Sequence, residues 1–543
     1  MAWTGRRTLT RLAVAGVTLA ALVAAAPAVS AGTAGGQAVA RPGGAGGTGG
    51  AGGPVAVTAN GAVRGVADGA VDEFLGLPYA APPVGALRWQ PPQPAASWTG
   101  VRDATAFGPH CPQSASPFGE ASMSENCLFL NVFAPSHDDP GAGHPVMVWI
   151  HGGALVTGES NDYDPTQLVE DGVTVVTINY RLGALGFLAH PALADAKGQS
   201  GDYGLEDQQA ALRWVQRNIA GFGGDPHNVT IFGESAGGLS TLSQVASPQA
   251  RGLFQKAIAE SGSYDLTQSS VSAAEAAGEA FASKAGCASQ TAACLRSLPV
   301  STILADEDAA GYTPNLNSEV LPEPLGTAFA TGAFNRVPII NGTNRDEWRL
   351  FVALSELEGN PVTASNYQSM ISSTLGVPAA AAAVIAAKYP LSAFPSPSVA
   401  LGAVGTDAIF ACPALTIDQS VSRFVPTFGY EFNDENAPEL FLPPVSFPYG
   451  AAHASEIQYL MDLPTAAFPG TLSAQQQRLA TIMKGYWTNF AERGFPSSPG
   501  TPFWPRFKNL TQKMQSLVPP APQTETDFAN THNCAFWTAL EAG

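Results

Sequence analysis

The sequence predicts an α/β protein with a large, mainly parallel central sheet flanked by helices. Short apolar runs recur along the chain, and longer stretches with helical periodicity separate them. Most of the short runs show no alternation of polar and apolar residues. A run without alternation is typical of a strand buried on both faces, as strands of parallel sheets are. We therefore expect helices on both sides of the sheet.

The clearest strand candidates are six short runs rich in β-branched and aromatic residues. They are VMVWI (146–150), VTVVTI (173–178), VTIF (229–232), AIAES (257–261), VPIIN (337–341) and FGYEF (428–432). Two helices are predicted from apolar residues at helical spacing. The first carries Leu205, Leu212, Val215 and Ile219; the second carries Leu479, Ile482, Met483, Tyr486, Trp487 and Phe490 and stops at Gly494.

Composition narrows the class of protein. The chain has 543 residues, 45% of them hydrophobic and 13% charged, which is enough apolar material for a large core. Its formal net charge of −18 would repel the phosphates of nucleic acids and of anionic lipids. We therefore expect no nucleic-acid partner.

The N-terminus resembles a secretory signal. Arg6, Arg7 and Arg11 precede and border an apolar run over 12–28, and small residues follow it. This pattern predicts a signal peptide over 1–31 and a secreted protein. The arginine pair leaves the twin-arginine route open, but such pairs are common in ordinary signals and the general secretory route is favoured. No other stretch is expected to be long and apolar enough to span a bilayer, so no stable membrane anchor is predicted.

The rest of the chain divides into a tether and one domain. Residues 32–54 are almost all Gly and Ala with a few Pro, a composition that predicts a disordered linker. No second linker interrupts the strand and helix pattern from Val55 onward. We therefore expect a single domain over 55–543.

The motif Gly233-Glu234-Ser235-Ala236-Gly237 predicts a catalytic nucleophile. It lies between the predicted strand VTIF and an expected helix beginning LSTLSQV. In this setting a G-x-S-x-G serine sits on a strained turn that exposes its hydroxyl above the sheet. The alternative is an ordinary strand-to-helix turn rich in small residues.

A second glycine-rich turn predicts an oxyanion hole. The strand VMVWI runs into His151-Gly152-Gly153-Ala154. Backbone N–H groups of such a turn can stabilise a developing oxyanion. The expected donors are Gly153, Ala154 and, from the nucleophile turn, Ala236.

A serine nucleophile needs a histidine base. In this fold the chain order is Ser, acid, His, which leaves His453 and His532 among the eight histidines. His453 lies in a loop of small residues before a predicted helix, where an exposed and mobile base is expected. His532 lies two residues from Cys534, in a segment that a disulfide would hold. The sequence favours His453, with an ordinary surface histidine as the alternative.

The acid is expected in the loop after VPIIN. Asp346 and Glu347 are adjacent there, and each could instead be a solvated carboxylate. Residue order alone does not separate the two.

Together these motifs resemble the type B carboxylesterase/cholinesterase family of α/β-hydrolases, and the chain as a whole resembles a secreted bacterial carboxylesterase. The markers, from about Val55 to Trp537, are FLGLPYAAPPVGALRW (74–89), ENCLFLNVF (125–133), WIHGGA (149–154), NYRLGALGFL (179–188), FGGDPHNVTIFGESAGG (222–238), GTNRDE (342–347), HASEI (453–457) and HNCAFW (532–537). The resemblance implies an α/β-hydrolase fold and a triad of Ser235, His453 and Glu347. It also implies that the N–H groups of Gly153, Ala154 and Ala236 form the oxyanion hole.

Three departures from the family pattern bear on specificity. Asn126 stands where an Asp is usual, which is expected to alter a structural salt bridge. Ala154 stands where cholinesterases commonly have a third Gly of this turn. Its backbone N–H is kept, but its methyl group is expected to narrow the part of the site that binds the acyl group. The 111–127 loop contains no Trp, whereas cholinesterases bind quaternary ammonium by cation–π contact with a Trp there. Choline-ester specificity is therefore not expected.

The six cysteines are expected to be structural. The resemblance implies the pairs Cys111–Cys127, Cys287–Cys294 and Cys412–Cys534. Metal ligation is the rival interpretation, but no C-x-x-C or H-x-x-x-H spacing occurs and export favours oxidation. We expect no metal and no cofactor.

The sequence therefore predicts a secreted serine carboxylesterase acting on small-molecule esters through an acyl-enzyme on Ser235. Two alternatives stay open: an acyltransferase that uses the same acyl-enzyme, and a catalytically silent binding module. The physiological ester and the oligomeric state are not determined by the sequence.

Overall fold

The computed structural model describes residues 52–136, 143–307, 312–317 and 319–542. The predicted signal peptide lies outside the described residues, and so does the predicted linker apart from residues 52–54.

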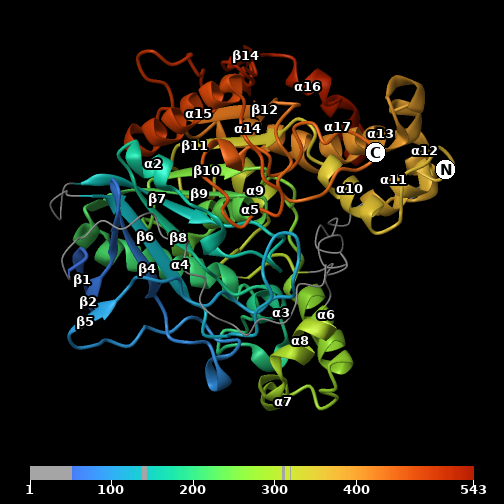
Figure 1. The fold of residues 1–543 in the computed structure, drawn as a ribbon. Helices are drawn as coiled ribbons and strands as arrows, with labels where there is room; N and C mark the ends of the chain where they lie inside the picture. Colours follow the sequence, from blue (N-terminus) through green and yellow to red (C-terminus); the bar gives the residue numbers. More distant parts are fainter. Residues whose placement is uncertain (1–51, 137–142, 308–311, 318, 543) are drawn as a thin grey trace, which may run out of the picture.

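A single large sheet organises the described chain (Figure 1). Its strands follow the order β14 (Gln523–Glu525), β13 (Met514–Leu517), β12 (Thr427–Phe432), β11 (Ile339–Asn344), β10 (Lys256–Glu260), β9 (Gly224–Glu234), β7 (His144–Ile150), β8 (Thr174–Ile178), β6 (Phe129–Pro135), β4 (Val71–Pro78) and β3 (Val66–Asp68). From β8 to β13 all neighbours pair in parallel, and antiparallel strands extend both edges. A small separate sheet contains β1 (Val55–Thr58), β2 (Gly61–Arg64) and β5 (Val101–Asp103).

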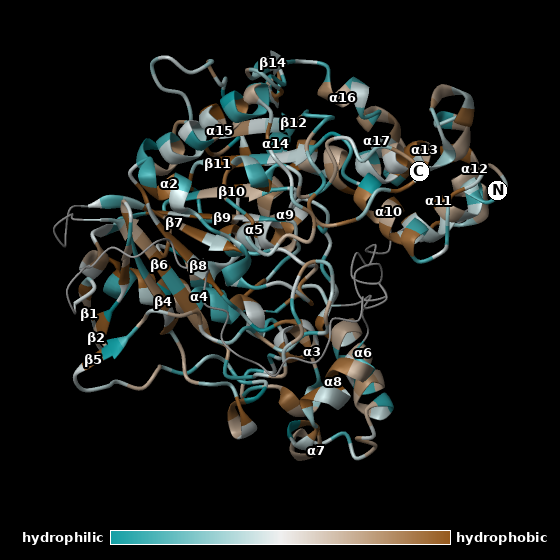
Figure 2. Cartoon of the chain, in the orientation of Figure 1, coloured by the Kyte–Doolittle hydropathy of each residue, from teal (hydrophilic) through white to brown (hydrophobic). Residues whose placement is uncertain are grey.

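The described part of the chain also contains helices, some on the two faces of the large sheet and others extending beyond it (Figure 1). They are α2 (Thr166–Glu170), α3 (Gly183–Phe187), α4 (Tyr203–Asn218), α5 (Ala236–Ala246), α6 (Val271–Lys284), α7 (Ala292–Ser297), α8 (Val300–Asp306), α9 (Leu325–Thr331), α10 (Arg349–Leu357), α11 (Tyr367–Leu375), α12 (Ala379–Lys388), α13 (Pro397–Gly405), α14 (Cys412–Val421), α15 (Ala474–Arg493), α16 (Phe528–Thr531) and α17 (Cys534–Ala542). Met147 and Trp149 of β7 belong to a core cluster with α15, whereas Val148 and Ile150 belong to the cluster with α4 and α5. The central strands are therefore buried on both sides, and Figure 2 colours much of β7 and β10 as hydrophobic.

The predicted α/β architecture is confirmed, and each of the six predicted strands is present. Their ends differ by a few residues because pairing, not hydropathy, defines a strand. β9 begins at Gly224, five residues before the apolar run, because Gly224 pairs with His144 of β7. β11 continues past its apolar residues to Asn344, which pairs with Phe432 of β12. Both predicted helices are also present, as α4 and as α15 capped by Gly494.

One expectation about membrane spans is wrong. The segment Pro397–Val421 is long and apolar enough to cross a bilayer by length and composition, although none was expected beyond the signal. The bent pair Tyr367–Leu375 and Ala379–Ala393 passes the same test if the two helices are taken together. In the fold, 78% of the apolar window within Pro397–Val421 is buried inside the protein, as for a core helix of a large domain.

All six cysteines are in disulfides. The pairs are Cys111–Cys127, Cys287–Cys294 and Cys412–Cys534, the same pairs that the resemblance implies. The last of these joins the start of α14 to the start of α17 across a separation of 122 residues.

Removing the long disulfide is expected to destabilise the protein more than removing the short one. In the chain-entropy model, closing the long loop contributes about 5 kcal/mol and closing the seven-residue separation of Cys287–Cys294 about 2 kcal/mol. Cys412→Ala/Cys534→Ala should therefore lower the urea midpoint clearly more than Cys287→Ala/Cys294→Ala. Equal midpoints for the two double variants would contradict the entropic explanation.

Candidate active site

The nucleophile turn joins β9 directly to α5. Ser235 has φ 56° and ψ −119°, outside the regions that L-residues usually occupy, and α5 begins at the next residue. Its backbone is held by two hydrogen bonds: its N–H donates to the Glu260 carbonyl, and its carbonyl accepts from the N–H of Leu239 (both 2.9 Å). Strain of this kind persists only where the surroundings fix it, and it clusters at functional sites.

Glycines make this turn possible because neighbouring backbones approach too closely for a side chain. A Cβ on Gly237 would lie 1.9 Å from the Ile150 carbonyl oxygen, and one on Gly233 would lie 2.4 Å from the same atom. A Cβ on Gly262 would lie 2.2 Å from the carbonyl carbon of Gly238. Gly233 and Gly237 are thus required by the close approach of β7, and Gly262, just after β10, by the close approach of Gly238 in α5.

The second glycine-rich turn follows β7 and borders the nucleophile turn. Gly153 and Ala154 have positive φ angles of 91° and 54°, and the Gly153 carbonyl accepts hydrogen bonds from the N–H groups of Val156 and Thr157 (both 3.0 Å). His151 is buried and stacks on Tyr180, with ring centroids 4.5 Å apart. Burial lowers the pKa of His151 to about 4, so its imidazole is neutral at pH 7. The turn therefore presents no positive side-chain charge of its own.

His453 contacts Glu347 and not Asp346. The distance between His453 Nδ1 and Glu347 Oε2 is 2.6 Å, and Glu347 is fully buried. The second oxygen, Oε1, accepts hydrogen bonds from the Thr343 hydroxyl and the Asn344 N–H, both at 2.7 Å. These three contacts fix the carboxylate at the end of β11.

Asp346 supports the loop instead. Its carboxylate pairs with Arg349 at 2.8 Å and accepts the N–H of Ala451 at 3.1 Å. Asp346 N–H in turn donates to the Ala451 carbonyl. The sequence did not separate the two adjacent acids, but they face different partners. Glu347 faces His453, and Asp346 is hydrogen-bonded to Ala451, in the loop that contains His453.

His453 is not the exposed residue that the sequence predicted. Only 5% of its surface is accessible, and its ring lies between Phe351 and Phe410, with centroid distances of 5.2 and 5.1 Å. The predicted helix after it is a single 3-10 turn, Ile457–Tyr459. The sequence predicted that the small residues of this loop make it mobile. In the structure they allow the histidine to pack closely instead.

Further carboxyl groups lie buried next to this pair, and the sequence analysis missed them. Glu234 Oε1 is 3.2 Å from His453 Nε2. Burial, with the charges of Glu347 and Glu260, raises the pKa of Glu234 well above its ordinary value. Burial and the same kind of repulsion raise the pKa of Glu456 to about 8. Burial also raises the pKa of Glu260, and Glu260 Oε1 accepts a hydrogen bond from the indole N–H of Trp487. Burial thus favours the protonated form of these three glutamates.

Tyr264 is another residue that the sequence did not single out. Its hydroxyl hydrogen-bonds to the side chain of Ser235, and its ring packs on Phe410 at 5.6 Å. Phe410 thus contacts both Tyr264 and His453. The position of Tyr264 in the chain carries no motif that could have indicated this contact.

A cavity of about 600 Å³ contains the predicted residues. Ser235, His453 and the Gly152–Ala154 turn all line it, together with residues of the 111–127 loop. A larger hollow of about 870 Å³ around Arg251 and Arg336 contains none of them. The chemistry predicted from the sequence therefore belongs to the smaller cavity.

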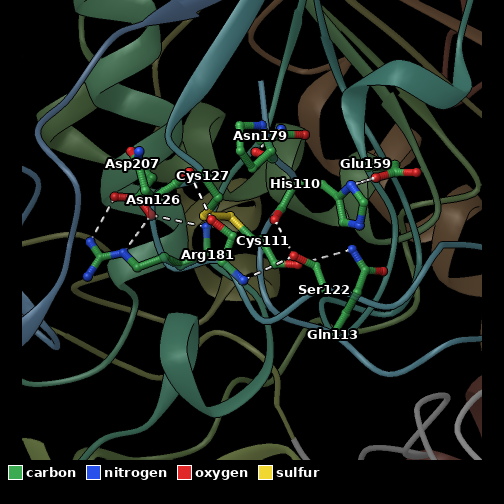
Figure 3. Close-up of a disulfide and its surroundings, with 12 residues drawn as sticks. His110, Cys111, Gln113, Ser122, Asn126, Cys127, Glu159, Asn179, Arg181 and Asp207 are labelled. Atoms are coloured by element: carbon green, nitrogen blue, oxygen red, sulfur yellow. Dashed lines mark hydrogen bonds and ion pairs between the residues drawn. A yellow bond between two sulfur atoms is a disulfide. The ribbon is translucent and has the colours of Figure 1, made fainter. Parts of the chain in front are cut away.

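The disulfide Cys111–Cys127 ties the base of the loop that borders this cavity (Figure 3). His110 forms an ion pair with the buried Glu159 beside it, and Arg181 pairs with Asp207 at 2.7 Å. Arg88 donates to both carboxylate oxygens of Glu125, at 2.6 and 2.5 Å. Asn126, which replaces the usual Asp, takes part in none of these ion pairs next to the disulfide.

His532, the other downstream histidine, lies away from the cavity. Its ring bridges two buried carboxylates: Nδ1 is 2.6 Å from Asp407 and Nε2 is 2.6 Å from Glu431. Burial alone would lower the pKa of His532, but these two negative charges outweigh it and raise the pKa to about 10. His532 is therefore a charged structural residue. Across the described ranges, no group of three or more His, Cys, Asp or Glu side chains is arranged to hold a metal ion.

The parallel sheet, the strained serine at a strand-to-helix turn and the histidine–carboxylate pair define an α/β-hydrolase. Comparison with known proteins agrees: residues 52–537 match the model of the carboxylesterase family. The chain is 35% identical to a mouse acylcarnitine hydrolase over 501 residues, covering 86% of this chain and 88% of the relative. It is 35% identical to a para-nitrobenzyl esterase of Bacillus subtilis over 483 residues (84% and 94%) and 34% identical to a human cocaine esterase over 523 residues (89% and 91%). The chain belongs to the carboxylesterase family and is a carboxylic ester hydrolase.

The ion-paired His532 is expected to stabilise the fold in a pH-dependent way. His532→Asn leaves Asp407 and Glu431 buried without their cation, which costs about 3–5 kcal/mol. Because the folded pKa is raised, the stabilisation is complete below about pH 6.5 and is lost as the pH rises through about 10. The difference in urea midpoint between wild type and variant should therefore shrink between pH 6 and about pH 10.5. A difference that stays constant with pH would contradict the charged state of His532.

Proposed function

We propose that this protein is a secreted serine carboxylesterase that works through an acyl-enzyme on Ser235. The observation that carries the proposal is the 2.6 Å contact between Glu347 and His453 beside the cavity that Ser235 lines. In this proposal Glu347 orients the imidazole and stabilises its charged form. Glu234 Oε1 lies 3.2 Å from the other ring nitrogen of His453, Nε2, and burial raises the pKa of Glu234 well above its ordinary value.

The reaction proceeds in two halves. His453 Nε2 takes the proton of the Ser235 hydroxyl as its oxygen attacks the ester carbonyl carbon. The N–H groups of Gly153, Ala154 and Ala236 stabilise the tetrahedral oxyanion, and His453 then protonates the leaving alcohol. In the second half a water molecule, deprotonated by His453, attacks the acyl-enzyme and releases the acid. Ala236 suits its role because it is the first residue of α5, where backbone N–H groups lack intrahelical partners.

The substrates are small esters, as for other esterases of this family. The relatives named above act on acylcarnitines, para-nitrobenzyl esters and cocaine according to their names. Secretion is supported by the N-terminal sequence and by three disulfides, which persist in oxidising compartments. N-terminal sequencing of the protein recovered from the culture medium tests export: a mature chain that still begins at Met1 would contradict it.

Ser235→Ala is expected to reduce kcat/KM for p-nitrophenyl butyrate by at least about a thousandfold, because the acyl-enzyme can no longer form. Glu347→Gln should reduce kcat by roughly a thousandfold or more, since the amide cannot stabilise the imidazolium. Asp346→Asn is the matched control: it should cost stability and leave a far larger fraction of activity.

Labelling with an organophosphonate probe complements the kinetics. Wild type should be labelled at Ser235, and Ser235→Ala should not be labelled. Undiminished hydrolysis by Ser235→Ala would disprove the assignment, and a folded wild type that neither hydrolyses esters nor reacts with the probe would indicate a silent binding module. Product analysis with added alcohols separates hydrolysis from acyl transfer.

A further inference from the structure

The ionisable side chains that line the catalytic cavity are acidic, apart from His453 and Tyr163. Glu120, Asp162 and Glu234 contribute carboxyl groups, and no Lys or Arg is among the described residues that line it. The three acids differ in depth: Glu120 is exposed, Asp162 is half-buried and Glu234 is buried. An anionic substrate would meet no Lys or Arg among these lining residues, whereas a cation would meet carboxyl groups at each depth.

Within the part of the chain that the structure describes, Asp162 makes no ion pair with a basic side chain. Its Oδ1 accepts a hydrogen bond from the Thr465 hydroxyl at 2.7 Å. The charges of Glu159, Glu120 and His110 act on it, and His110 is already paired with Glu159. Burial, followed by the charge of Glu159, raises the pKa of Asp162 to about 8. A carboxyl group destabilised in this way gains from any cation that enters beside it.

A second observation also indicates a missing donor or cation. Oε1 of Glu234 receives no hydrogen bond from the described residues, although Glu234 is only 3% exposed and lines the cavity. This oxygen lies 3.2 Å from His453 Nε2. Buried polar atoms normally have a hydrogen-bond partner, so an oxygen at the cavity wall without one can accept a hydrogen bond from a ligand.

The remaining walls are apolar. Phe351 and Leu350 of α10 line the cavity, as do Ile457 and Leu463. Phe118 of the 111–127 loop contacts Phe441, with ring centroids 5.4 Å apart, and both line the cavity. The cavity thus offers apolar surface to a hydrocarbon group of a ligand and carboxyl groups to a positively charged group.

We infer that the cavity selects esters that carry a protonated amine, and that Asp162, with Glu120 at the rim, recognises the ammonium group. This inference rests on the proposed serine esterase function and specifies its substrate class. The recognition differs from that of a quaternary ammonium by an aromatic face, because a carboxylate accepts a hydrogen bond from N–H as well as attracting the charge. An anionic ester of the same shape is rejected.

Matched esters test the inference without changing shape. On the alcohol side, butyrate esters of dimethylaminopropanol, 4-methylpentanol and 4-hydroxybutanoate are protonated, neutral and anionic respectively, and the trimethylammonio ester adds a cation without N–H. On the acyl side, the ethyl ester of 6-dimethylaminohexanoate, the ethyl ester of 7-methyloctanoate and the monoethyl ester of heptanedioate form the same series. Acid release is followed by titration for all of them. We expect kcat/KM in at least one series to fall from ammonium to neutral to anionic ester by about tenfold at each step.

Asp162→Asn should lower kcat/KM for the ammonium ester about tenfold, raise it for the anionic ester, and leave the neutral ester within about twofold. Glu120→Gln should act in the same direction with a smaller effect, because its carboxylate is exposed and screened. Glu170→Gln is the matched control: it removes one negative charge at the exposed end of α2, outside the cavity, and should change no ratio.

The pH dependence gives an independent readout. As the pH rises through about 8, Asp162 loses its proton and its charge becomes available to the ammonium. The ratio of kcat/KM for ammonium over neutral ester should therefore rise between about pH 6.5 and 8.5 in wild type and stay flat in Asp162→Asn. Taking the ratio removes pH effects that are common to both esters.

Three outcomes would overturn the inference: anionic and neutral esters hydrolysed equally well in both series, Asp162→Asn changing all three charge types alike, or a quaternary ester surpassing the protonated one. Each of these leaves the serine esterase proposal intact as long as neutral esters are hydrolysed and Ser235→Ala is inactive. Activity in Ser235→Ala would instead remove the proposed function on which the inference rests.

Discussion

The site depends on the close approach of three backbones at the nucleophile turn. Gly233 pairs with Ile150 of β7, and Glu234 pairs with Glu260 of β10, so the three strands end at nearly the same level of the sheet. Glycine at 233 and 237 lets the turn approach the Ile150 carbonyl, and Ser235 between them has φ 56°. The glycine-rich turn at 152–154 starts from the same edge. Main-chain packing therefore places the proposed nucleophile next to the proposed oxyanion donors.

Local features of this architecture were predictable from the sequence. The strands were recognised because parallel strands buried on both faces are apolar without alternation, and Gly494 marked the end of α15 because it caps the helix with φ 72°. The serine turn and the turn at 152–154 were found because their glycines are required by local geometry. The buried helical segment Pro397–Val421 shows the limit of this reasoning. A helix surrounded by protein and a helix surrounded by lipid have the same composition, so hydropathy does not separate them.

The side-chain environment was less predictable because it joins residues that are distant in the chain. Asp346 and Glu347 are equivalent in a one-dimensional pattern, and they differ only because Asn344 and Thr343 hold one carboxylate toward His453 while Arg349 and Ala451 hold the other. The burial of His453 comes from Phe351 and Phe410, which lie about 100 and 40 residues before it. Asp407, on a π-helical turn (Thr406–Ala411), meets His532 in the same way. Such contacts follow from topology and leave no local signal.

The charge of −18 gains a more specific meaning from the structure. A formal count assigns every carboxyl group a negative charge, but burial and repulsion between carboxyl groups raise the pKa of Asp162 and of Glu456 to about 8, and raise those of Glu234 and Glu260 well above their ordinary value. Asp162 and Glu456 therefore carry less negative charge at neutral pH than the count assigns to them. Their raised pKa values cost stability as the pH rises, because the folded protein holds these protons above the pH at which the unfolded chain releases them. Among the described residues that line the cavity no Lys or Arg offsets this cost, and a cation in the substrate would offset it on binding.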